Sequence, residues 1–278
     1  MRPMRNVLRG VVVSLMAVLL FSSYGRSQNR QATQTQPTAS DAYNRLAATG
    51  PGGPAPKKDL TGFWGGPAAQ KTNPVPPMTP LGQQVFKTHK NESEYVVAES
   101  NDPIKSCDPL GFPRNMVFQT RGLVVAQMPD RMLVMSMYNK AWREIWTDGR
   151  ALPTNVGANS PDAPDPRFYG YSVGHWEDDY TFVVDSLGTD DRTWLDQTGH
   201  PHSADMHVQE RFKRVDHNTL EDEITINDPK MYTKPFVLST ARWRWLPEQD
   251  FEEEICVPSV MQDYLSLIAN PAANGPGK

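Results

Sequence analysis

The sequence predicts an all-β fold of mainly antiparallel strands, in the form of a single β-barrel with a short helix near each end of the folded part. Apolar and polar residues alternate with a period of two through most of the chain. Turn-forming residues interrupt this alternation at spacings of roughly eight to twelve positions, as in antiparallel barrels. Helical periodicity is confined to two short segments that flank the strands. A β-sandwich built from the same strands is the alternative.

The first 27 residues have the pattern of a secretory signal peptide. Arg2, Arg5 and Arg9 precede the apolar run 11–21, which is shorter than the roughly 20 residues that cross a bilayer. We therefore expect cleavage near Ser27, a periplasmic or secreted protein, and no stable membrane insertion.

Two segments have the composition of disordered chain. Residues 28–58 are rich in Gln, Thr, Ser, Ala, Pro and Gly, and residues 270–278 have the same character. Neither can bury a core, so we expect a disordered linker and a disordered tail. One β-rich domain then covers residues 59–269.

The charge of the chain excludes some partners. Loss of the signal peptide would remove four arginines and no acid, which changes 28 basic against 32 acidic residues into 24 against 32. An acidic protein is poorly suited to bind nucleic acid, because the phosphate backbone rewards clustered Lys and Arg. The sequence does not predict the oligomeric state.

Strands are expected in the following order along the chain, and together they amount to about nine or ten. Early strands lie near Phe63 and Val117. The later strands form a three-stranded meander and three hairpins: Gly122–Met128, Met132–Tyr138 and Ala141–Thr147; Tyr171–Trp176 with Tyr180–Ser186; Met206–Val215 with Thr219–Asn227; and Val237–Leu246 with Phe251–Val257. In the last hairpin Arg244 is expected opposite Glu253, with the neighbouring tryptophans in the core or a ligand cavity.

The two helices are predicted from their first residues. Thr79 followed by Pro80 is typical of a helix start, and that helix is expected to reach about His89. Near the C-terminus Ser259 is expected to cap a second helix. Its apolar stripe should pack against the sheet or close a barrel mouth: Val260, Met261, Tyr264, Leu265 and Ile268.

Cys107 and Cys256 are the chain's two cysteines. In an exported protein such a pair more often forms a disulfide than two separate thiols. We expect a disulfide, with two buried thiols as the alternative.

The segment 193–212 contains three of the six histidines and several charged side chains. A three-residue loop after Val215 would place Lys213 opposite Glu221 and Arg211 opposite Glu223, two favourable cross-strand pairs on an outer face. The same register sends Glu210 inward, into an otherwise apolar row. A buried carboxylate has a raised pKa that suits proton transfer. Glu210 is therefore the first catalytic candidate, with a structural ion pair to an internal arginine or tyrosine as the alternative.

His200 and His202 belong to the loop that leads into this strand, with Asp196 nearby. Imidazoles and a carboxylate could hold a metal or assist Glu210 as acid and base. The spacing does not fix a third ligand, so it leaves metal binding open. Hydrogen bonding within the loop is the alternative for these residues. No motif for a cofactor is present, and no cofactor is expected.

Several short motifs together resemble a family of secreted bacterial proteins to which no activity is assigned. They are Pro113-Arg114, Asp148-Gly-Arg150, Ser172-Val-Gly-His-Trp-Glu177, Thr193-Trp-Leu-Asp196, Gly199-His-Pro-His-Ser203 and Glu210-Arg-Phe212. The resemblance covers residues 79–236 and carries over no catalytic residue.

Gly62-Phe63-Trp64 resembles, more weakly, the start of the first strand of lipocalins. This resemblance implies a closed antiparallel barrel with a cavity for an apolar small molecule and a helix packed outside. The proline-rich segment 65–80 departs from the lipocalin plan.

We expect a small, largely apolar ligand to bind inside the barrel. One alternative is a hydrolase, lyase or isomerase that uses Glu210 with His202, His200 and Asp196. A second alternative is a structural or partner-binding exported protein.

Overall fold

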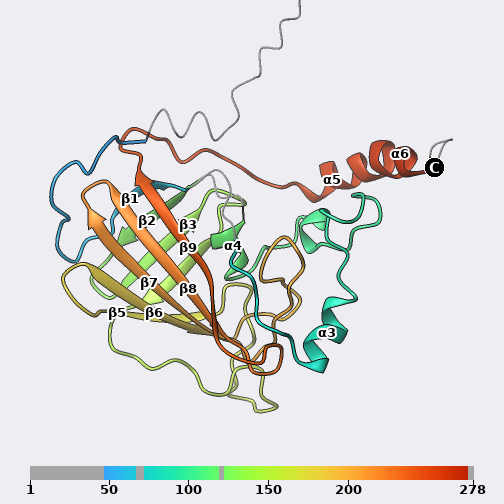
Figure 1. The fold of residues 1–278 in the computed structure, drawn as a ribbon, viewed down its shortest axis with the longest axis horizontal. Helices are drawn as coiled ribbons and strands as arrows, with labels where there is room; N and C mark the ends of the chain where they lie inside the picture. The colour runs from blue at the N-terminus through green and yellow to red at the C-terminus, as the bar shows by residue number, and fades with distance from the viewer. Residues whose placement is uncertain (1–46, 67–71, 119–121, 275–278) are drawn as a thin grey trace, which may run out of the picture. The chain divides into compact units, whose positions relative to one another are not determined.

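Nine β-strands close into a barrel in the computed structural model, which describes residues 47–66, 72–118 and 122–274 (Figure 1). The strands are β1 (Gly62–Gly65), β2 (Leu123–Gln127), β3 (Arg131–Ser136), β4 (Trp142–Trp146), β5 (Tyr171–Trp176), β6 (Thr181–Leu187), β7 (His207–Asp216), β8 (Thr219–Asn227) and β9 (Phe236–Trp245). The predicted single, mainly antiparallel barrel is confirmed, and the sandwich is wrong. The signal peptide expected at residues 1–27, residues 28–46 of the expected linker and residues 275–278 of the tail lie outside the described residues.

Neighbouring strands in the barrel are neighbours in the sequence, and β9 returns to pair with β1. Tight turns make this order possible. Between β3 and β4, Asn139 and Lys140 have φ values of 55° and 50°. Two consecutive residues with positive φ form the turn whose twist suits a hairpin, and asparagine tolerates this conformation well.

One neighbouring pair of strands, β4 and β5, runs parallel. A closed ring with an odd number of strands cannot alternate direction all the way round, so one pair has to be parallel. A parallel pair needs a long crossover between its strands, and residues 147–170 provide it. Only Ile145–Ser172 and Trp146–Val173 are in register across this seam.

The predicted register of β7 and β8 is confirmed for both charged pairs, Lys213–Glu221 and Arg211–Glu223. The turn differs from the expectation. Asp216, not Val215, lies opposite Thr219, because a bulge between Arg214 and Asp216 absorbs one residue.

Two predicted strands are wrong. Val117 ends the short helix α4 (Arg114–Val117). Residues 251–257 form no strand, because β1 occupies the edge of β9 that a hairpin partner would need. Arg244 accordingly does not face Glu253; it donates to Oγ1 of Thr219 and to the backbone carbonyls of Ala48 and Gly50.

Part of the predicted linker is held against the barrel. Ala48 donates to the carbonyl of Trp245, and the carbonyl of Pro51 accepts from the amide of Asn218. The disorder predicted for residues 28–58 therefore does not describe the last residues of that segment.

The first predicted helix, α3 (Pro80–Phe86), begins as expected at the cap Thr79, whose side chain accepts from the amide of Gly82. It ends at Phe86 rather than near His89. A 3₁₀ turn, η1 (Pro103–Ser106), begins at Asp102, which accepts from the amide of Ile104.

The C-terminal helix differs from its prediction. It comprises α5 (Pro258–Tyr264), the π-helical turn η2 (Leu265–Ala269) and α6 (Asn270–Ala273), so helix covers residues expected in the disordered tail. Val257, not Ser259, is the N-cap residue. The apolar stripe does not pack against the sheet: Val260 is 65% exposed and Ile268 is 57% exposed.

The interior of the barrel is filled by side chains. Large aromatic residues from β1, β6, β7 and β9 are buried there, namely Trp64, Phe182, Phe212 and Trp243. Phe112 and Met116, from the segment around α4, belong to the same core. These side chains stand where the lipocalin resemblance implied a cavity for an apolar ligand.

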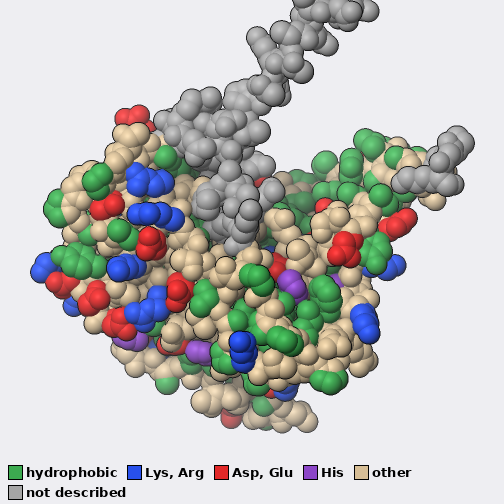
Figure 2. Space-filling model, in the orientation of Figure 1, with side chains coloured by type: hydrophobic (Ala, Val, Ile, Leu, Met, Phe, Trp, Pro, Cys, Tyr) green, Lys and Arg blue, Asp and Glu red, His purple; other side chains and the backbone are tan. Residues whose placement is uncertain are grey.

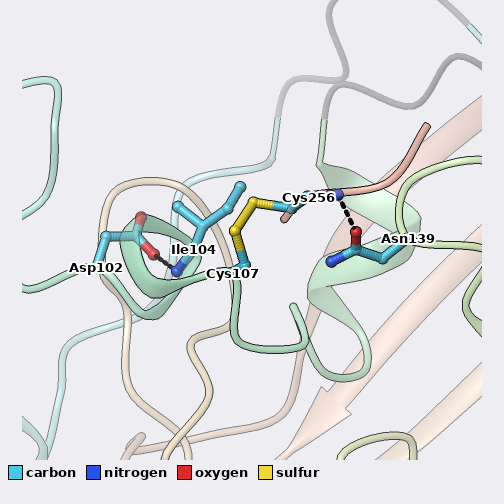
Figure 3. Close-up of a disulfide and its surroundings, with 5 residues drawn as sticks. All are labelled: Asp102, Ile104, Cys107, Asn139 and Cys256. Carbon is cyan, nitrogen blue, oxygen red and sulfur yellow. Dashed lines mark hydrogen bonds between the residues drawn. A yellow bond between two sulfur atoms is a disulfide. The ribbon is translucent and has the colours of Figure 1, made fainter. Parts of the chain in front are cut away.

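Cys107 and Cys256 form the predicted disulfide, with their Cα atoms 5.4 Å apart. Figure 3 shows the bond between the turn that begins at Asp102 and the segment after β9. The amide of Cys256 donates to Oδ1 of Asn139 at 2.6 Å, which ties the same point to the β3–β4 turn. None of the helices in the described part of the chain has the length and apolar character needed to span a membrane.

Candidate functional site

The predicted loop residues Asp196 and His200 form a closed hydrogen-bonded turn. The Oδ1 atom of Asp196 accepts from the amide and the hydroxyl of Thr198, at 2.9 and 2.7 Å. Its Oδ2 atom lies 2.6 Å from Nδ1 of His200. Burial acts to raise the pKa of Asp196, but the hydrogen bonds from His200 and Thr198 outweigh it and lower this pKa.

His202 is buried beneath this turn. Its Nε2 lies 2.8 Å from the hydroxyl of Thr193, and its Nδ1 lies 3.2 Å from the carbonyl of Ser203. Burial lowers the pKa of His202, so the ring is neutral near pH 7. The hydroxyl of Ser203 donates in turn to Asp228 at 2.8 Å.

The histidine loop, residues 193–205, is hydrogen-bonded within itself, to the segment 228–232, and to His89 and Asn91 after α3. The hydroxyl of Tyr232, for example, donates to the carbonyl of Pro201. The hydrogen bonds of His200 and His202 end within the loop, and none reaches Glu210. Within the residues that the structure describes, no three His, Cys, Asp or Glu side chains are grouped as metal ligands would be.

Glu210 points into the barrel, as predicted, and is completely buried. The Nη2 atom of Arg143, from β4, donates to Oε2 of Glu210 at 2.5 Å. This contact is the ion pair with an internal arginine that the sequence analysis gave as the alternative to a catalytic role for Glu210. Burial acts to raise the pKa of Glu210, whereas the charge of Arg143 and its hydrogen bond act to lower it; burial is the larger effect.

A second carboxyl group, Asp222, lies inside the barrel near Glu210 and was not among the predicted site residues. It is opposite Phe212 on β8, on the same face as Glu210. Burial and the charge of Glu210 hold the pKa of Asp222 well above its usual range and so favour its protonated form.

Polar atoms of this central group, which consists of Arg143, Glu210 and Asp222, are unsatisfied within the described part of the protein. They are Nε and Nη1 of Arg143, Oε1 of Glu210, and both carboxyl oxygens of Asp222. Most buried polar atoms in proteins have a partner, and a functional role is one explanation for those that have none. The central group therefore has unused capacity to bind polar atoms.

Arg143 also lines a cavity of about 740 Å³ at the seam between β4 and β5. The remaining lining comes from β4, from both ends of the crossover, from the start of β5 and from the segment after β6: Trp142, Glu144, Trp146, Arg150–Pro153, Pro166–Val173, Asp190 and Arg192. This volume is typical of sites for small molecules.

The offset between the two seam strands explains the cavity. In the parallel register Tyr171, the first residue of β5, comes level with Glu144. The preceding residues of β4, Trp142 and Arg143, have no partner on the β5 side. The segment 166–170 passes this open edge without pairing with it, and the space between them is the seam cavity.

The seam cavity combines aromatic rings with guanidinium groups. Arg150 and Arg192 are neutralised locally by ion pairs with Asp148 and Asp190. Arg167 stacks on the ring of Tyr171, with its Cζ atom 4.2 Å from the ring centre, and has no acidic partner among the described residues. Burial raises the pKa of Tyr169 to about 12, so this phenol is neutral at physiological pH.

The outer surface of the strands is different in character. Figure 2 shows basic and acidic side chains interspersed over the barrel strands in view. Arg211 pairs with Glu177, and His207 lies 3.2 Å from Asp185, so both face outward, as the register predicted for Arg211. These groups form a solvated face.

No family of known proteins, no curated protein and no solved structure matches the chain. The candidate site therefore depends on the geometry of the seam cavity and the central group. Of the predicted residues, Glu210 belongs to it, whereas His202, His200 and Asp196 belong to the histidine loop. Sequence reasoning missed Arg143, Asp222 and the seam cavity; the alternation that placed Glu210 inward also placed Asp222 inward.

Proposed function

We propose that this protein binds a small, planar and largely apolar ligand in the seam cavity. The observation that carries the proposal is a volume of about 740 Å³ lined by Trp142, Trp146, Phe168, Tyr169 and Tyr171. Aromatic walls favour a flat ligand, because rings stack on rings and the burial of apolar area drives binding. The expected ligand class is the one predicted for the barrel interior, but the position moves to the barrel wall.

The enzymatic alternative, a hydrolase, lyase or isomerase, has less support. Glu210 and Asp222 have the raised pKa values that acid–base catalysis uses. However, the hydrogen bonds of His200 and Asp196 lie within the histidine loop, and neither these residues nor Asp222 line the seam cavity. A binding protein accounts for more of the described contacts.

The proposal includes export to the periplasm or the medium. A disulfide that joins distant segments is typical of oxidising compartments, and it agrees with the signal-peptide pattern of residues 1–27.

Isothermal titration with the uncharged probe 2-naphthamide tests the proposal. We expect saturable binding with one site per chain. Ala151→Trp, which puts a large ring on a residue that lines the seam cavity, should abolish that binding. Ala158→Trp, a matched change at an exposed position outside the cavity lining, should leave it intact. Equal binding by both variants would place the probe elsewhere and overturn the proposal.

A further inference from the structure

We propose that the seam cavity selects a ligand with a carboxylate, that Arg143 receives this carboxylate, and that the central group takes up one proton when the ligand binds. This inference rests on the proposed binding function and names the chemical class of the ligand.

The guanidinium group of Arg143 keeps hydrogens free for a second partner. A guanidinium group presents two edges for bidentate binding of a carboxylate, Nε with Nη2 and Nη1 with Nη2. Glu210 accepts one hydrogen from Nη2, while Nε and Nη1 have no partner among the described residues. Whichever Nη2 hydrogen Glu210 accepts, the other edge keeps both of its hydrogens.

The side chain of Arg143 is held in one position by its neighbours. Arg143 is 3% exposed, lines the seam cavity and packs over the ring of Phe112, with its Cζ atom 4.0 Å from the ring centre. The guanidinium plane is therefore held in place before a ligand arrives. A donor group fixed in this way binds with less loss of side-chain entropy than a mobile one.

Few ionisable groups surround Glu210 in the described part of the barrel. The residues that flank Glu210 across β6 and β8 are Val184 and Ile224, and β9 contributes Ser239 beyond them. Arg143 and Asp222 are thus the ionisable groups that face Glu210 from the surrounding strands. A carboxylate bound to Arg143 would add a second negative charge beside a single positive one.

A buried site does not readily hold that excess charge, because an unpaired buried ion is costly. The carboxylate of Glu210 can remove it by taking one proton from solvent, and burial already raises the pKa of Glu210. The ligand anion and the proton then enter together, and the net charge of the site is unchanged. Arg167, whose charge has no acidic partner in the described chain, favours the approach of an anion at the rim.

The experiment compares two probes of equal shape, 2-naphthoate and 2-naphthamide, by isothermal titration at pH 6, 7 and 8. We expect 2-naphthoate to bind at least about tenfold more tightly than the amide at pH 6. Its Kd should rise with pH, by up to about tenfold per unit, whereas the Kd of the amide should stay constant. Titrations in phosphate and in Tris, which differ in ionisation heat, should show uptake of about one proton for 2-naphthoate and none for the amide.

Two variants assign these effects to residues. Arg143→Lys keeps the charge but loses the bidentate edge, so it should weaken the binding of 2-naphthoate at least about tenfold more than it weakens the binding of 2-naphthamide. Glu210→Gln should bind 2-naphthoate with no proton uptake and no pH dependence. Glu177→Gln, the same change on the outer face, should behave like the wild type.

The outcomes separate the two proposals. If neither probe binds, the proposed function fails, and this inference fails with it. If both probes bind equally, or 2-naphthoate binds without proton uptake, the binding function stands and the carboxylate inference is overturned. The measurements on the wild type decide this even if Arg143→Lys or Glu210→Gln does not fold.

Discussion

At the scale of single residues, Arg143 and Glu210 are the most consequential pair, because both are removed from solvent and each is the other's charged partner. A buried ion pair contributes little net stability compared with apolar side chains, but the loss of one partner leaves an uncompensated buried charge. The pair therefore constrains which substitutions the barrel tolerates.

Arg143→Met should lower the free energy of unfolding by about 3–5 kcal/mol, because it leaves Glu210 without its partner. Urea denaturation at pH 7 measures this loss. Arg211→Met removes the same side chain from an exposed pair with Glu177 and should cost less than about 1 kcal/mol. Similar losses for the two variants would contradict the special role of the buried pair.

The raised pKa of Asp222 makes the free energy of unfolding depend on pH. The raised pKa keeps a proton on Asp222 in the folded protein at pH values at which aspartates in an unfolded chain, with a pKa of about 4, have already lost theirs. Unfolding then releases a proton, so the contribution of Asp222 to the free energy of unfolding falls as pH rises from about 4 to its folded-state pKa.

Asp222→Asn cannot titrate and should lose this dependence. Relative to the wild type, the variant should become more stable as pH rises from 5 to 8, by up to about 1.4 kcal/mol per pH unit. Urea denaturation of both proteins across this range tests the prediction. A stability difference that stays constant with pH would show that Asp222 is ionised in the folded protein.

Alternation along a strand explains how much of the central group the sequence could predict. Two charged pairs fix the register of β7 and β8, and this register places both Glu210 and Asp222 inward. Arg143 could not be inferred in the same way. It lies between Trp142 and Glu144 on β4, and only the tertiary structure shows that the arginine is buried while Trp142 is 59% exposed.

At the scale of elements, hairpins could be predicted and the seam could not. A hairpin is local, because its turn residues and cross-strand pairs adjoin in the sequence. The parallel pairing of β4 and β5 follows from the odd number of strands in the closed ring. This number is a property of the whole barrel, so it cannot be predicted from the sequence of any one segment. The apolar stripe of the C-terminal helix was expected to pack against the sheet, but Val260 and Ile268 are exposed. A periodic pattern shows only that a helix has an apolar face; it does not show that another element covers that face.

The start of α3 provides a prediction at this scale. The hydroxyl of Thr79 accepts from the amide of Gly82 at 3.1 Å and donates to the carbonyl of Lys230 at 2.5 Å. Thr79→Ala should therefore lower the free energy of unfolding by about 1–2 kcal/mol, measured by thermal or urea denaturation. Thr79→Ser keeps the hydroxyl and should retain most of the stability. Equal losses for Ala and Ser would assign the effect to the methyl group instead.

At the scale of the whole molecule, the disulfide links the turn before α4 to the segment after β9, across a sequence separation of 149 residues. A cross-link that closes so long a loop restricts the unfolded chain strongly. The double variant Cys107→Ser with Cys256→Ser should lose about 2–5 kcal/mol of unfolding free energy.

Thiol titration and denaturation with and without reductant check this prediction. The unreduced wild type should show no reactive thiol after denaturation. The reduced wild type should match the double variant in stability. An unreduced wild type no more stable than the double variant would show that the bond contributes little.

The same bond gives the chain the topology of a closed covalent ring. The ring contains every strand from β2 to β9 and leaves β1 outside it. A single cleavage in the crossover 147–170 would therefore release no fragment, because the two pieces would remain joined through sulfur. Such nicked molecules would migrate as one polypeptide until the sample is reduced, so electrophoresis without reductant would not reveal whether the wall of the seam cavity has been cut.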